Sequence, residues 1–304
     1  MKIVVLGGTG AMGSIYGSHL SLHHEVYLVG RKAELAEQIN REGLILQEKG
    51  ENVTYRPNAV TSTADIGCAD LVLLFVKALA SEDALTANRA LIGPNTYLMT
   101  LQNGSGHEEI LSKFVPMERI VIGTTEDNGK ILSPGHVYHG GTGRTNIGML
   151  APDKNEFLPK LKAALDECGF DAKIHSNIQQ LIWNKLFTNV SLSAVTGVLQ
   201  VPMGYIAENE YAWALTTQLI QEAVAVAHAL SLEANEEAIL SKVRATALES
   251  PEGITSICAD LRAGRKTEVN TISGSVVRAA KKVGVPAPTH ECIVNLIHAM
   301  EQKT

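Results

Sequence analysis

The sequence predicts an α/β fold in which an N-terminal doubly wound sheet, residues 1–175, is followed by an all-helical C-terminal domain, residues 176–304. Three observations support this fold class. Apolar, β-rich runs alternate with helical stretches through the first half, a glycine motif joins the first run to the first helix, and the second half reads as amphipathic helices. A length of 304 residues also suits two domains better than one.

The first half contains a βαβ unit followed by further strands. Residues 2–6 form a short apolar run that ends in glycines, residues 11–22 a helix and residues 25–29 a second strand. The most hydrophobic run, residues 71–76, is too short for a helix and is typical of a central strand. The remaining strand candidates are residues 96–101, 119–124, 135–139 and 145–149, of which the last two lie in a glycine-rich region that we expect to be antiparallel.

The character of the sequence changes near residue 175. Breakers such as Pro202, Pro251 and Pro286 separate long amphipathic stretches from there onward. We expect a compact hinge at residues 174–176 and helices at residues 177–199, 207–230, 234–248, 267–283 and 289–302.

Composition excludes several classes of function. A net charge of −6 argues against a nucleic-acid or anionic-membrane partner, and an aromatic content of 5% argues against a stacking surface for single strands. We therefore expect no nucleic-acid partner and no membrane partner. The N-terminal apolar run is too short for a signal peptide, and no run approaches the length of a membrane span, so we expect a soluble, cytoplasmic protein.

Neither the cysteines nor the histidines form a recognisable metal motif. The four cysteines are widely spaced without a CxxC pair, which predicts free thiols in a reducing cytosol: Cys68, Cys168, Cys258 and Cys292. His136 and His139 are three residues apart but have no nearby cysteine or carboxylate partner. The sequence therefore predicts no metal site.

The glycine motif reads Gly8-Thr9-Gly10-Ala11-Met12-Gly13 and matches G-x-G-x-x-G between a predicted strand and a predicted helix. In this context Gly8 permits a tight turn, Gly10 lets a pyrophosphate approach the helix N-terminus, and Gly13 allows close packing. The motif predicts a Rossmann-type dinucleotide site. An additional Gly7 precedes it, so the turn could be longer than usual.

The end of the second strand indicates which nicotinamide cofactor fits. NAD enzymes usually place a carboxylate there for the ribose 2′-hydroxyl, whereas this chain has Arg31 and Lys32. A guanidinium can bind a 2′-phosphate in a bidentate way. The alternative is that both cations begin a helix on the solvated surface. We expect NADP(H).

Three polar residues share one face of the first C-terminal helix. Lys185, Asn189 and Ser193 are spaced i, i+4, i+8. A positioned ammonium can stabilise the charge that grows on a carbonyl oxygen during hydride addition and can transfer a proton. The alternative is an ordinary solvent-facing stripe.

Four motifs together resemble the ketopantoate reductase family over nearly the whole chain. The C-terminal segment S-x-x-x-D-x-x-x-x-x-x-T-E-[IV]-[DN]-x-[IL]-x-G matches at Ser256, Asp260, Thr267, Glu268, Val269, Asn270, Ile272 and Gly274, with Ile257 where the family often has methionine. The other three are the helix motif at Trp183, Lys185, Leu186 and Asn189, the run Leu101-Gln102-Asn103-Gly104-Ser105-Gly106, and the pair Val76-Lys77.

The resemblance implies an NADPH-dependent reduction of 2-dehydropantoate (ketopantoate) to pantoate, a step of pantothenate and coenzyme A biosynthesis. It implies that Lys185 is the general acid and that Glu268 holds substrate polar groups and orients the lysine. Asn189 and Ser256 would bind substrate oxygens. Asn103 would lie where nicotinamide and substrate meet, and Lys77 near the nicotinamide ribose. Taken without the resemblance, Glu268 reads as a carboxylate at a helix N-terminus and Ser256 as a helix N-cap.

One departure affects the substrate. Many family members carry a second asparagine where this chain has Ser193, and serine is shorter and offers fewer donors. An alternative is therefore a broader reductase of branched or aromatic 2-oxo acids that gives D-2-hydroxy acids. A further alternative is a non-catalytic NADP-binding sensor, which would need neither Lys185 nor Glu268. The sequence is compatible with a homodimer.

Overall fold

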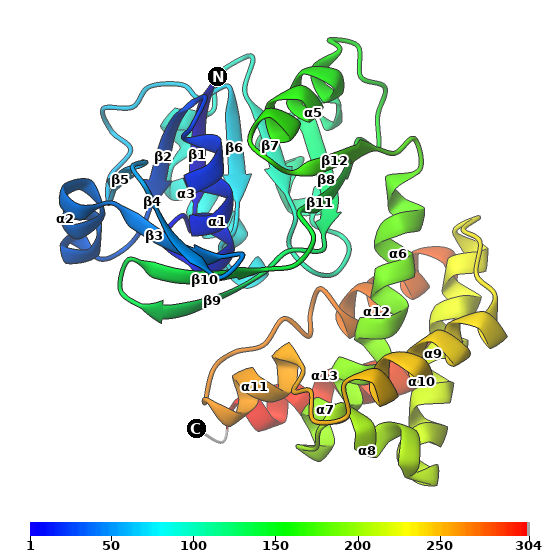
Figure 1. Cartoon of the computed structure of the whole chain (residues 1–304). Helices are drawn as coiled ribbons and strands as arrows, with labels where there is room; N and C mark the ends of the chain where they lie inside the picture. The colour runs from blue at the N-terminus through cyan, green and yellow to red at the C-terminus, as the bar shows by residue number, and fades with distance from the viewer. Residues whose placement is uncertain (303–304) are drawn as a thin grey trace. The chain divides into compact units, whose positions relative to one another are not determined.

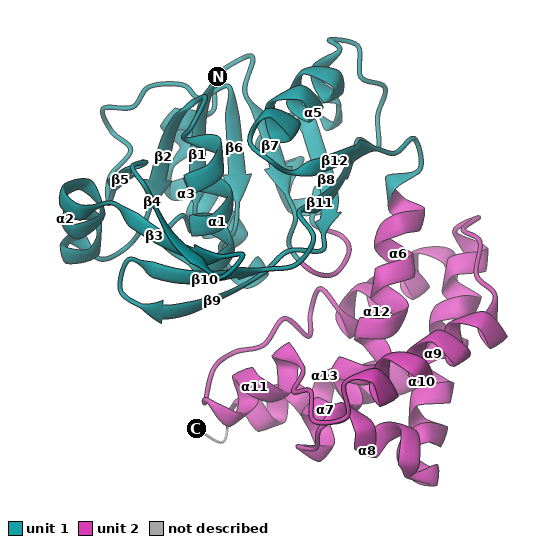
Figure 2. Ribbon diagram, viewed as in Figure 1, with its two compact units in different colours: residues 1–102, 107–178 teal, residues 103–106, 179–304 magenta. Residues whose placement is uncertain are grey.

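The computed structural model describes residues 1–302 and divides the chain into two compact units. Unit 1 contains residues 1–102 and 107–178. Unit 2 contains residues 103–106 and the chain from Gln179 onward (Figure 2). The short loop 103–106 therefore belongs by its contacts to the helical unit, although it follows a strand of unit 1.

Unit 1 is built on an eight-stranded sheet of order β12-β11-β8-β7-β6-β1-β2-β5 (Figure 1). Neighbouring strands are parallel except β11 and β8. The order β5-β2-β1-β6-β7-β8 is the 3-2-1-4-5-6 order of doubly wound nucleotide-binding folds. The strands are β1 (Lys2–Leu6), β2 (Glu25–Val29), β5 (Asn58–Val60), β6 (Leu71–Leu74), β7 (Tyr97–Thr100), β8 (Ile120–Thr125), β11 (Arg144–Gly148) and β12 (Asp171–Ile174).

The central strands are apolar throughout because both faces of the sheet are covered. Strands β6, β7 and β8 are buried at every position, and their core includes Leu73, Met99 and Val121. The α-helices of this unit are α1 (Ala11–Leu20), α2 (Ala33–Glu42), α3 (Ser81–Ala87), α4 (Glu108–Leu111) and α5 (Phe157–Glu167), and its 3₁₀ turns are Ala78–Ala80, Arg89–Leu91 and Met117–Arg119. The predicted α/β class and its doubly wound sheet are thus confirmed.

A second sheet of four strands, β4-β3-β10-β9, lies beside α1 in unit 1 (Figure 1). Its strands are β3 (Leu44–Glu48), β4 (Glu51–Tyr55), β9 (Asn128–Ser133) and β10 (His136–Gly140). Strand β10 pairs antiparallel with β9 and parallel with β3. Of these strands only β10 was predicted. Strands β4 and β9 are mostly exposed and show no apolar alternation, whereas β3 was missed although its residues are buried or half-buried.

Unit 2 consists of helices in the part of the chain that the structure describes. They are α6 (Ile178–Thr188), a π-helical segment (Asn189–Ser193), α7 (Ala194–Leu199), α8 (Met203–Glu208), α9 (Glu210–Ala229), α10 (Glu236–Glu249), α11 (Ser256–Arg262), α12 (Ser273–Val283) and α13 (Pro288–Glu301). Side chains of Asn209 and Asn235 cap α9 and α10 by accepting backbone N–H groups. Trp183, Phe187 and Leu219 are among its fully buried core residues.

The helices of unit 2 differ from the prediction in two respects. The helix expected at residues 267–283 begins only at Ser273, because the carbonyl of Glu268 accepts the N–H groups of Thr271 and Ile272 and closes a separate turn. Helices α8 and α11 were not predicted, since each is too short to show a periodic pattern.

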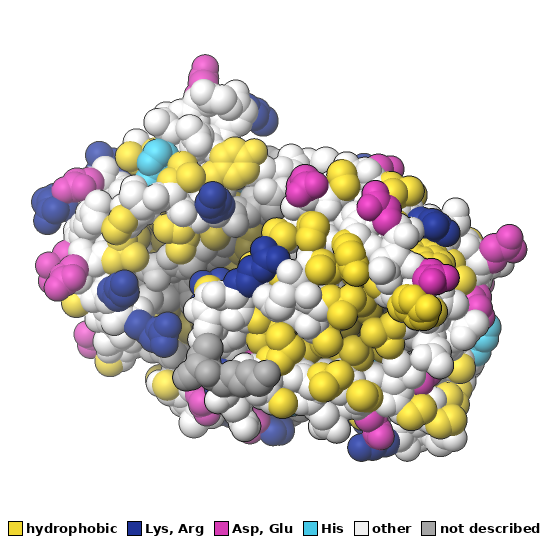
Figure 3. Space-filling view, turned by 90° about the horizontal axis from the view of Figure 1, so that it is seen from below, with side chains coloured by type: hydrophobic (Ala, Val, Ile, Leu, Met, Phe, Trp, Pro, Cys, Tyr) yellow, Lys and Arg dark blue, Asp and Glu magenta, His cyan; other side chains and the backbone are white. Residues whose placement is uncertain are grey.

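Apolar side chains gather on the surface of unit 2 that Figure 3 shows. Exposed members of this unit include Leu199 at the end of α7, Tyr205 in α8 and Tyr211 at the start of α9. Contiguous exposed apolar surface is typical of interaction sites. None of the described helices combines the length and apolar character that crossing a membrane requires.

His290 in α13 is a buried histidine, which we expect to make unit 2 sensitive to acid. The side chain is fully buried, and its Nε2 donates to the carbonyl of Leu219 at 2.9 Å. Burial lowers the pKa of His290 to about 4. The unfolded chain, with an ordinary histidine pKa near 6.5, therefore binds more protons between these two values, so stability is present above about pH 6.5 and is lost as the pH falls toward 4.

We expect this residue to remove about 2 kcal/mol from the free energy of unfolding between pH 7.5 and pH 5. In His290→Gln the free energy of unfolding should fall by about 2 kcal/mol less between these pH values than in the wild type. The same substitution at the exposed His228 should leave the wild-type loss unchanged. Urea unfolding at both pH values measures the difference. Identical pH slopes for wild type and His290→Gln would contradict the assignment.

Candidate active site

The glycine loop connects β1 to α1 by close backbone contacts. Gly8 N donates to the carbonyls of Val5 and Val29, and Gly10 N donates to the carbonyl of Gly7. A Cβ on Gly13 would lie 2.3 Å from the carbonyl oxygen of Gly7. No side chain larger than hydrogen fits there, so the start of α1 rests directly on the loop.

The left-handed residue of this loop is Gly7, directly before Gly8, and Gly8 lies in the tight turn that the Gly10 N to Gly7 carbonyl hydrogen bond closes. Gly7 has φ +81°, and a Cβ there would lie 2.6 Å from the backbone nitrogen of Val76. Gly8 is required for another reason, because its Cβ would lie 2.6 Å from the Cα of Leu28. The additional glycine is thus the residue that permits the left-handed backbone.

The N-terminus of α1 is suited to an anion. Its N-cap is Gly10, which offers no capping side chain, and its first turn contains no acidic residue. The first helical hydrogen bond runs from Ser14 N to the carbonyl of Gly10, so the N–H groups of Ala11 and Met12 precede it. Such an end attracts a phosphate group. These features fit a dinucleotide.

Arg31 and Lys32 follow β2 at the same edge of the sheet as the glycine loop. Strand β2 pairs with β1 so that Val29 lies opposite Leu6. A Cβ on Gly30 would lie 2.6 Å from the Thr9 side chain, so the loop and the end of β2 are in close contact. Both cations are exposed. Unit 1 thus brings Thr9 of the glycine loop next to the segment that carries Arg31.

Lys77 follows β6, the strand on the other side of β1. It is exposed and precedes a 3₁₀ turn. Ligands of doubly wound sheets bind at the carboxyl ends of strands where the order reverses, and here that point lies between β1 and β6. Lys77 is therefore placed at this switch point.

Gln102, which the sequence analysis did not single out, fixes the ends of β6 and β7. Its Nε2 donates to the carbonyl of Val76 and to Ser81 Oγ, and its Oε1 accepts from Thr100 Oγ1 at 2.7 Å. The side chain thereby holds the backbone just before Lys77 and just before Asn103. In the sequence, the only signal for this structural role of Gln102 is its place in the run Leu101–Gly106.

The polar stripe of unit 2 continues from α6 into the π-helical segment. Lys185 and Asn189 are partly buried and Ser193 is buried. In an α-helix each step of four residues drifts by about 40° around the axis. A π-helix turns less per residue, so the segment Asn189–Ser193 offsets this drift and brings Ser193 back toward the line of Lys185. Inserted π turns are frequent at functional sites.

Ser256 lies at the first turn of α11, but it is not the N-cap that we considered. Thr255 has that role, because its Oγ1 accepts from Cys258 N. The same oxygen lies 2.7 Å from Thr196 Oγ1 in α7. This contact places the start of α11 beside the helix that follows Ser193. Ser256 itself is exposed.

Glu268 is partly buried in the turn that precedes α12, five residues before the helix begins. The structure therefore excludes its alternative role as a carboxylate at a helix N-terminus. A network from α13 holds this turn. Glu301 Oε1 accepts from Thr267 N and Thr267 Oγ1, both at 2.7 Å.

The network continues through a histidine of the same helix. Glu301 Oε2 lies 2.8 Å from His298 Nδ1, and His298 Nε2 lies 3.0 Å from Asn270 Oδ1. The residues on both sides of Glu268 are thus fixed from α13. The sequence carries no signal for this network, since its members are about thirty residues apart.

The loop 103–106 docks on the same turn. Ser105 N donates to the carbonyl of Thr271 at 2.9 Å. Gly104 has φ +97°, and a Cβ there would lie 2.1 Å from that carbonyl oxygen. Two distant motifs, the one with Asn103 and the one with Glu268, are thereby brought together inside unit 2 (Figure 2).

Two family models match the chain. The model for ketopantoate reductase PanE/ApbA matches residues 3–152, and the model for its C-terminal part matches residues 177–301. Among curated proteins, the 2-dehydropantoate 2-reductase of Pyrococcus horikoshii is 30% identical over 99% of this chain and 98% of its own length.

Solved structures of similar fold cover the whole length of this chain. The 2-dehydropantoate 2-reductase from Geobacter metallireducens is 27% identical, with a TM-score of 0.87 over 100% of both chains. The ternary structure of a D-mandelate dehydrogenase with NADH and anilino(oxo)acetate is 31% identical, with a TM-score of 0.88 over 100% of this chain and 99% of that one. Since the two models together account for most of the sequence, the chain belongs to the ketopantoate reductase family.

Proposed function

We propose that this protein reduces 2-dehydropantoate to pantoate with NADPH, by hydride transfer to the keto carbon and protonation of the resulting oxygen by Lys185. The observation that carries the proposal lies in unit 2. Lys185 and Asn189 share one helical face, and the Asn103 loop docks on the turn of Glu268. These groups suit a small substrate that has a carboxylate and a carbonyl.

The cofactor role of unit 1 rests on the glycine loop and its surroundings. NADPH supplies the hydride when it is bound. We propose that the open end of α1 holds its pyrophosphate and that Arg31 and Lys32 hold its 2′-phosphate. Lys77, at the end of β6, would contact the nicotinamide ribose.

The chain's own residues then complete the reaction. As the keto oxygen gains negative charge, the Lys185 ammonium stabilises it and donates a proton, so that ketone, hydride and proton give the alcohol. Asn189 and Ser256 bind substrate oxygens. Glu268 orients the lysine and accepts from the substrate hydroxyl. Asn103 positions the substrate against the nicotinamide.

A broader reductase of branched or aromatic 2-oxo acids is the second candidate. The similarity to a D-mandelate dehydrogenase, whose ternary structure contains NADH, favours it, as does Ser193 in place of a second asparagine. The same similarity makes NADH an alternative cofactor for this protein. A non-catalytic sensor is less favoured, because sensing needs neither Lys185 nor Glu268.

The homodimer and the cytoplasmic location stay predictions. The apolar surface of unit 2 is one feature that would suit self-association. Size-exclusion chromatography with light scattering measures the oligomeric state directly.

Lys185→Ala should lower kcat by roughly 10²–10⁴, because general acid catalysis contributes about that much. NADPH affinity should change little. Lys242→Ala, which removes an exposed lysine from α10, is the matched control and should retain full activity. Steady-state kinetics and cofactor titration separate the two effects. Activity within a few-fold of wild type would contradict the role of Lys185 as general acid.

Arg31→Asp should weaken NADPH binding about 10- to 100-fold and change NADH binding little, since a charge-assisted hydrogen bond contributes about 1.5–3 kcal/mol. The control is Arg41→Asp, which makes the same charge change at the exposed end of α2. Fluorescence titration with both cofactors provides the comparison. A wild-type preference for NADH would refute the NADPH assignment.

Ketopantoate should exceed 2-oxoisovalerate in kcat/KM by about 5- to 150-fold. The smaller acid lacks the hydroxymethyl group and leaves buried polar groups unpaired, at about 1–3 kcal/mol for each. NADPH oxidation against both acids and an aryl 2-oxo acid decides the substrate. Equal or higher efficiency with either alternative would transfer the assignment to the broader reductase.

A further inference from the structure

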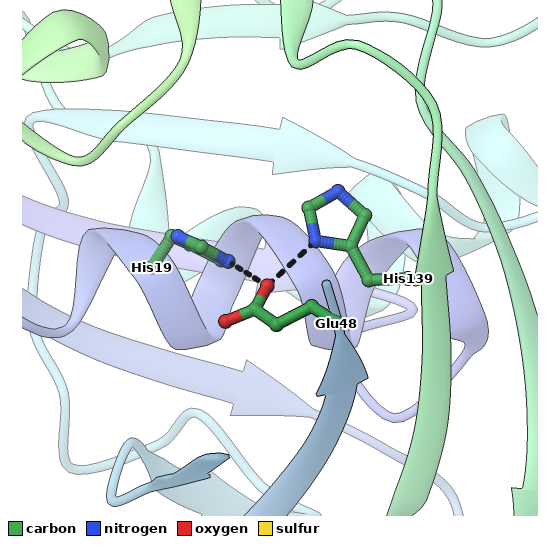
Figure 4. Close-up of side chains that lie close together, drawn as sticks. All are labelled: His19, Glu48 and His139. Carbon is green, nitrogen blue, oxygen red and sulfur yellow. Dashed lines mark hydrogen bonds and ion pairs between the residues drawn. The ribbon is translucent and has the colours of Figure 1, made fainter. Parts of the chain in front are cut away.

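Two histidines and a glutamate meet in unit 1, away from the glycine loop. His19 lies in the last turn of α1, Glu48 ends β3, and His139 lies in β10 (Figure 4). The two rings point at the same carboxylate oxygen, Glu48 Oε2. The distances are 2.9 Å from His19 Nε2 and 2.8 Å from His139 Nδ1. The three ligand atoms all lie within 4.8 Å of one another.

The far side of each ring is fixed by an acceptor. His19 Nδ1 lies 3.1 Å from the carbonyl of Cys168, and His139 Nε2 lies 3.2 Å from Asp127 Oδ1. A carbonyl and a carboxylate can only accept, so these ring nitrogens carry the hydrogens. In the neutral rings, the nitrogens that face Glu48 therefore present lone pairs.

Lone pairs on two nitrogens and on a carboxylate oxygen then face one another. This arrangement requires a positive species between them, either a proton on each ring or one metal ion. Histidine ligands of metals usually donate their other N–H to a carboxylate or a backbone carbonyl, and both arrangements occur here. Glu48 is also supported, since its other oxygen, Oε1, accepts from Tyr55 OH at 2.7 Å.

The surroundings favour a cation. Asp127 has a fully buried side chain and also accepts from Gly143 N at 2.9 Å, so its contact with His139 is held in place. His19 lies at the carboxyl end of α1, where the helix dipole is negative. The three ligand side chains retain 14–16% exposure, which leaves access for an ion and a water molecule.

We propose that His19, Glu48 and His139 bind one divalent transition-metal ion, with Zn²⁺ the best match for two imidazoles and a carboxylate. Zinc–ligand distances of about 2.0–2.2 Å in a tetrahedron separate the ligand atoms by about 3.3 Å. The two nitrogens would therefore move outward from Glu48 Oε2 by about half an ångström. Water would complete the coordination.

The ion would join α1 to the small sheet. Because α1 has ten residues, the site lies about 15 Å along the helix from its phosphate-facing end. The metal would thus stabilise unit 1 without contacting the cofactor loop. The sequence analysis predicted no metal site because it considered His139 only with His136, whose Nε2 lies 3.3 Å from Asn52 Oδ1.

The test is calorimetric titration of ZnCl₂ into the chelator-treated full chain. Exposed Cys68 and Cys292 are replaced by serine to remove competing thiols. We expect one ion per chain and a rise in melting temperature of about 5–10 °C at a zinc concentration about 100 times Kd. Co²⁺ in place of zinc should give the visible absorption bands of a tetrahedral site.

Variants locate the ion. His139→Ala should weaken zinc binding by more than the roughly 10- to 100-fold that loss of a supporting group costs. His136→Ala, in the same strand, should bind as the parent does. Glu48→Gln keeps the shape of the side chain but removes its charge, and it should also weaken zinc binding. It provides the test in case His139→Ala does not fold. Equal affinity in His139→Ala and His136→Ala, or no saturable binding in the parent, would show that protons alone occupy the cluster.

Discussion

The contact between Gly13 and the carbonyl of Gly7 determines how unit 1 is assembled. A single methyl group at Gly13 would lie 2.3 Å from that oxygen, so α1 can approach the β1 loop this closely only because residue 13 is a glycine. The position of α1 then fixes both of its ends. The N-terminal end offers N–H groups to an anion, and the carboxyl end carries His19 to Glu48 and His139. One backbone contact thereby influences both the open N-terminal end of α1 and the cluster of His19, Glu48 and His139.

Unit 2 depends on a comparable contact, between Gly104 and the carbonyl of Thr271. There the approach joins a loop that follows β7 to a turn that precedes α12. Glu301 and His298, which follow the turn in the sequence, hold it through Thr267 and Asn270. The turn around Glu268 is therefore held by two separate segments of the chain, the loop 103–106 and α13. In the proposed function, a carboxylate on a turn held in this way would lose less conformational freedom when it orients a substrate or a lysine.

Local features could be predicted from the sequence, and features formed by distant segments could not. Strands β1, β2 and β6 follow from apolar runs, and the α6–α7 region follows from its helical period. Strands β4 and β9 expose most of their residues, so no pattern marks them. The site shows the same division. Motifs indicated Lys185, Asn189 and Glu268. The structural roles of four other residues become evident only when segments far apart in sequence lie side by side: Gln102, Glu301, His19 and Glu48. The roles of the motif residues remain proposals.

The fold alone does not decide the substrate, because the same architecture, at nearly the same identity, includes a D-mandelate dehydrogenase and 2-dehydropantoate 2-reductases. The features of unit 1 serve a dinucleotide and carry no information about a 2-oxo acid. Under the proposed function, discrimination between 2-oxo acids would come from unit 2, where the π-helical segment carries Ser193. It brings Ser193 back toward the line of Lys185, so the residue at that position can reach the same substrate as the lysine. A serine provides one hydroxyl where an asparagine would provide two N–H donors and a carbonyl. If the proposed function holds, the π turn would let the single side chain at position 193 influence substrate choice without altering Lys185, the turn of Glu268 or the glycine loop.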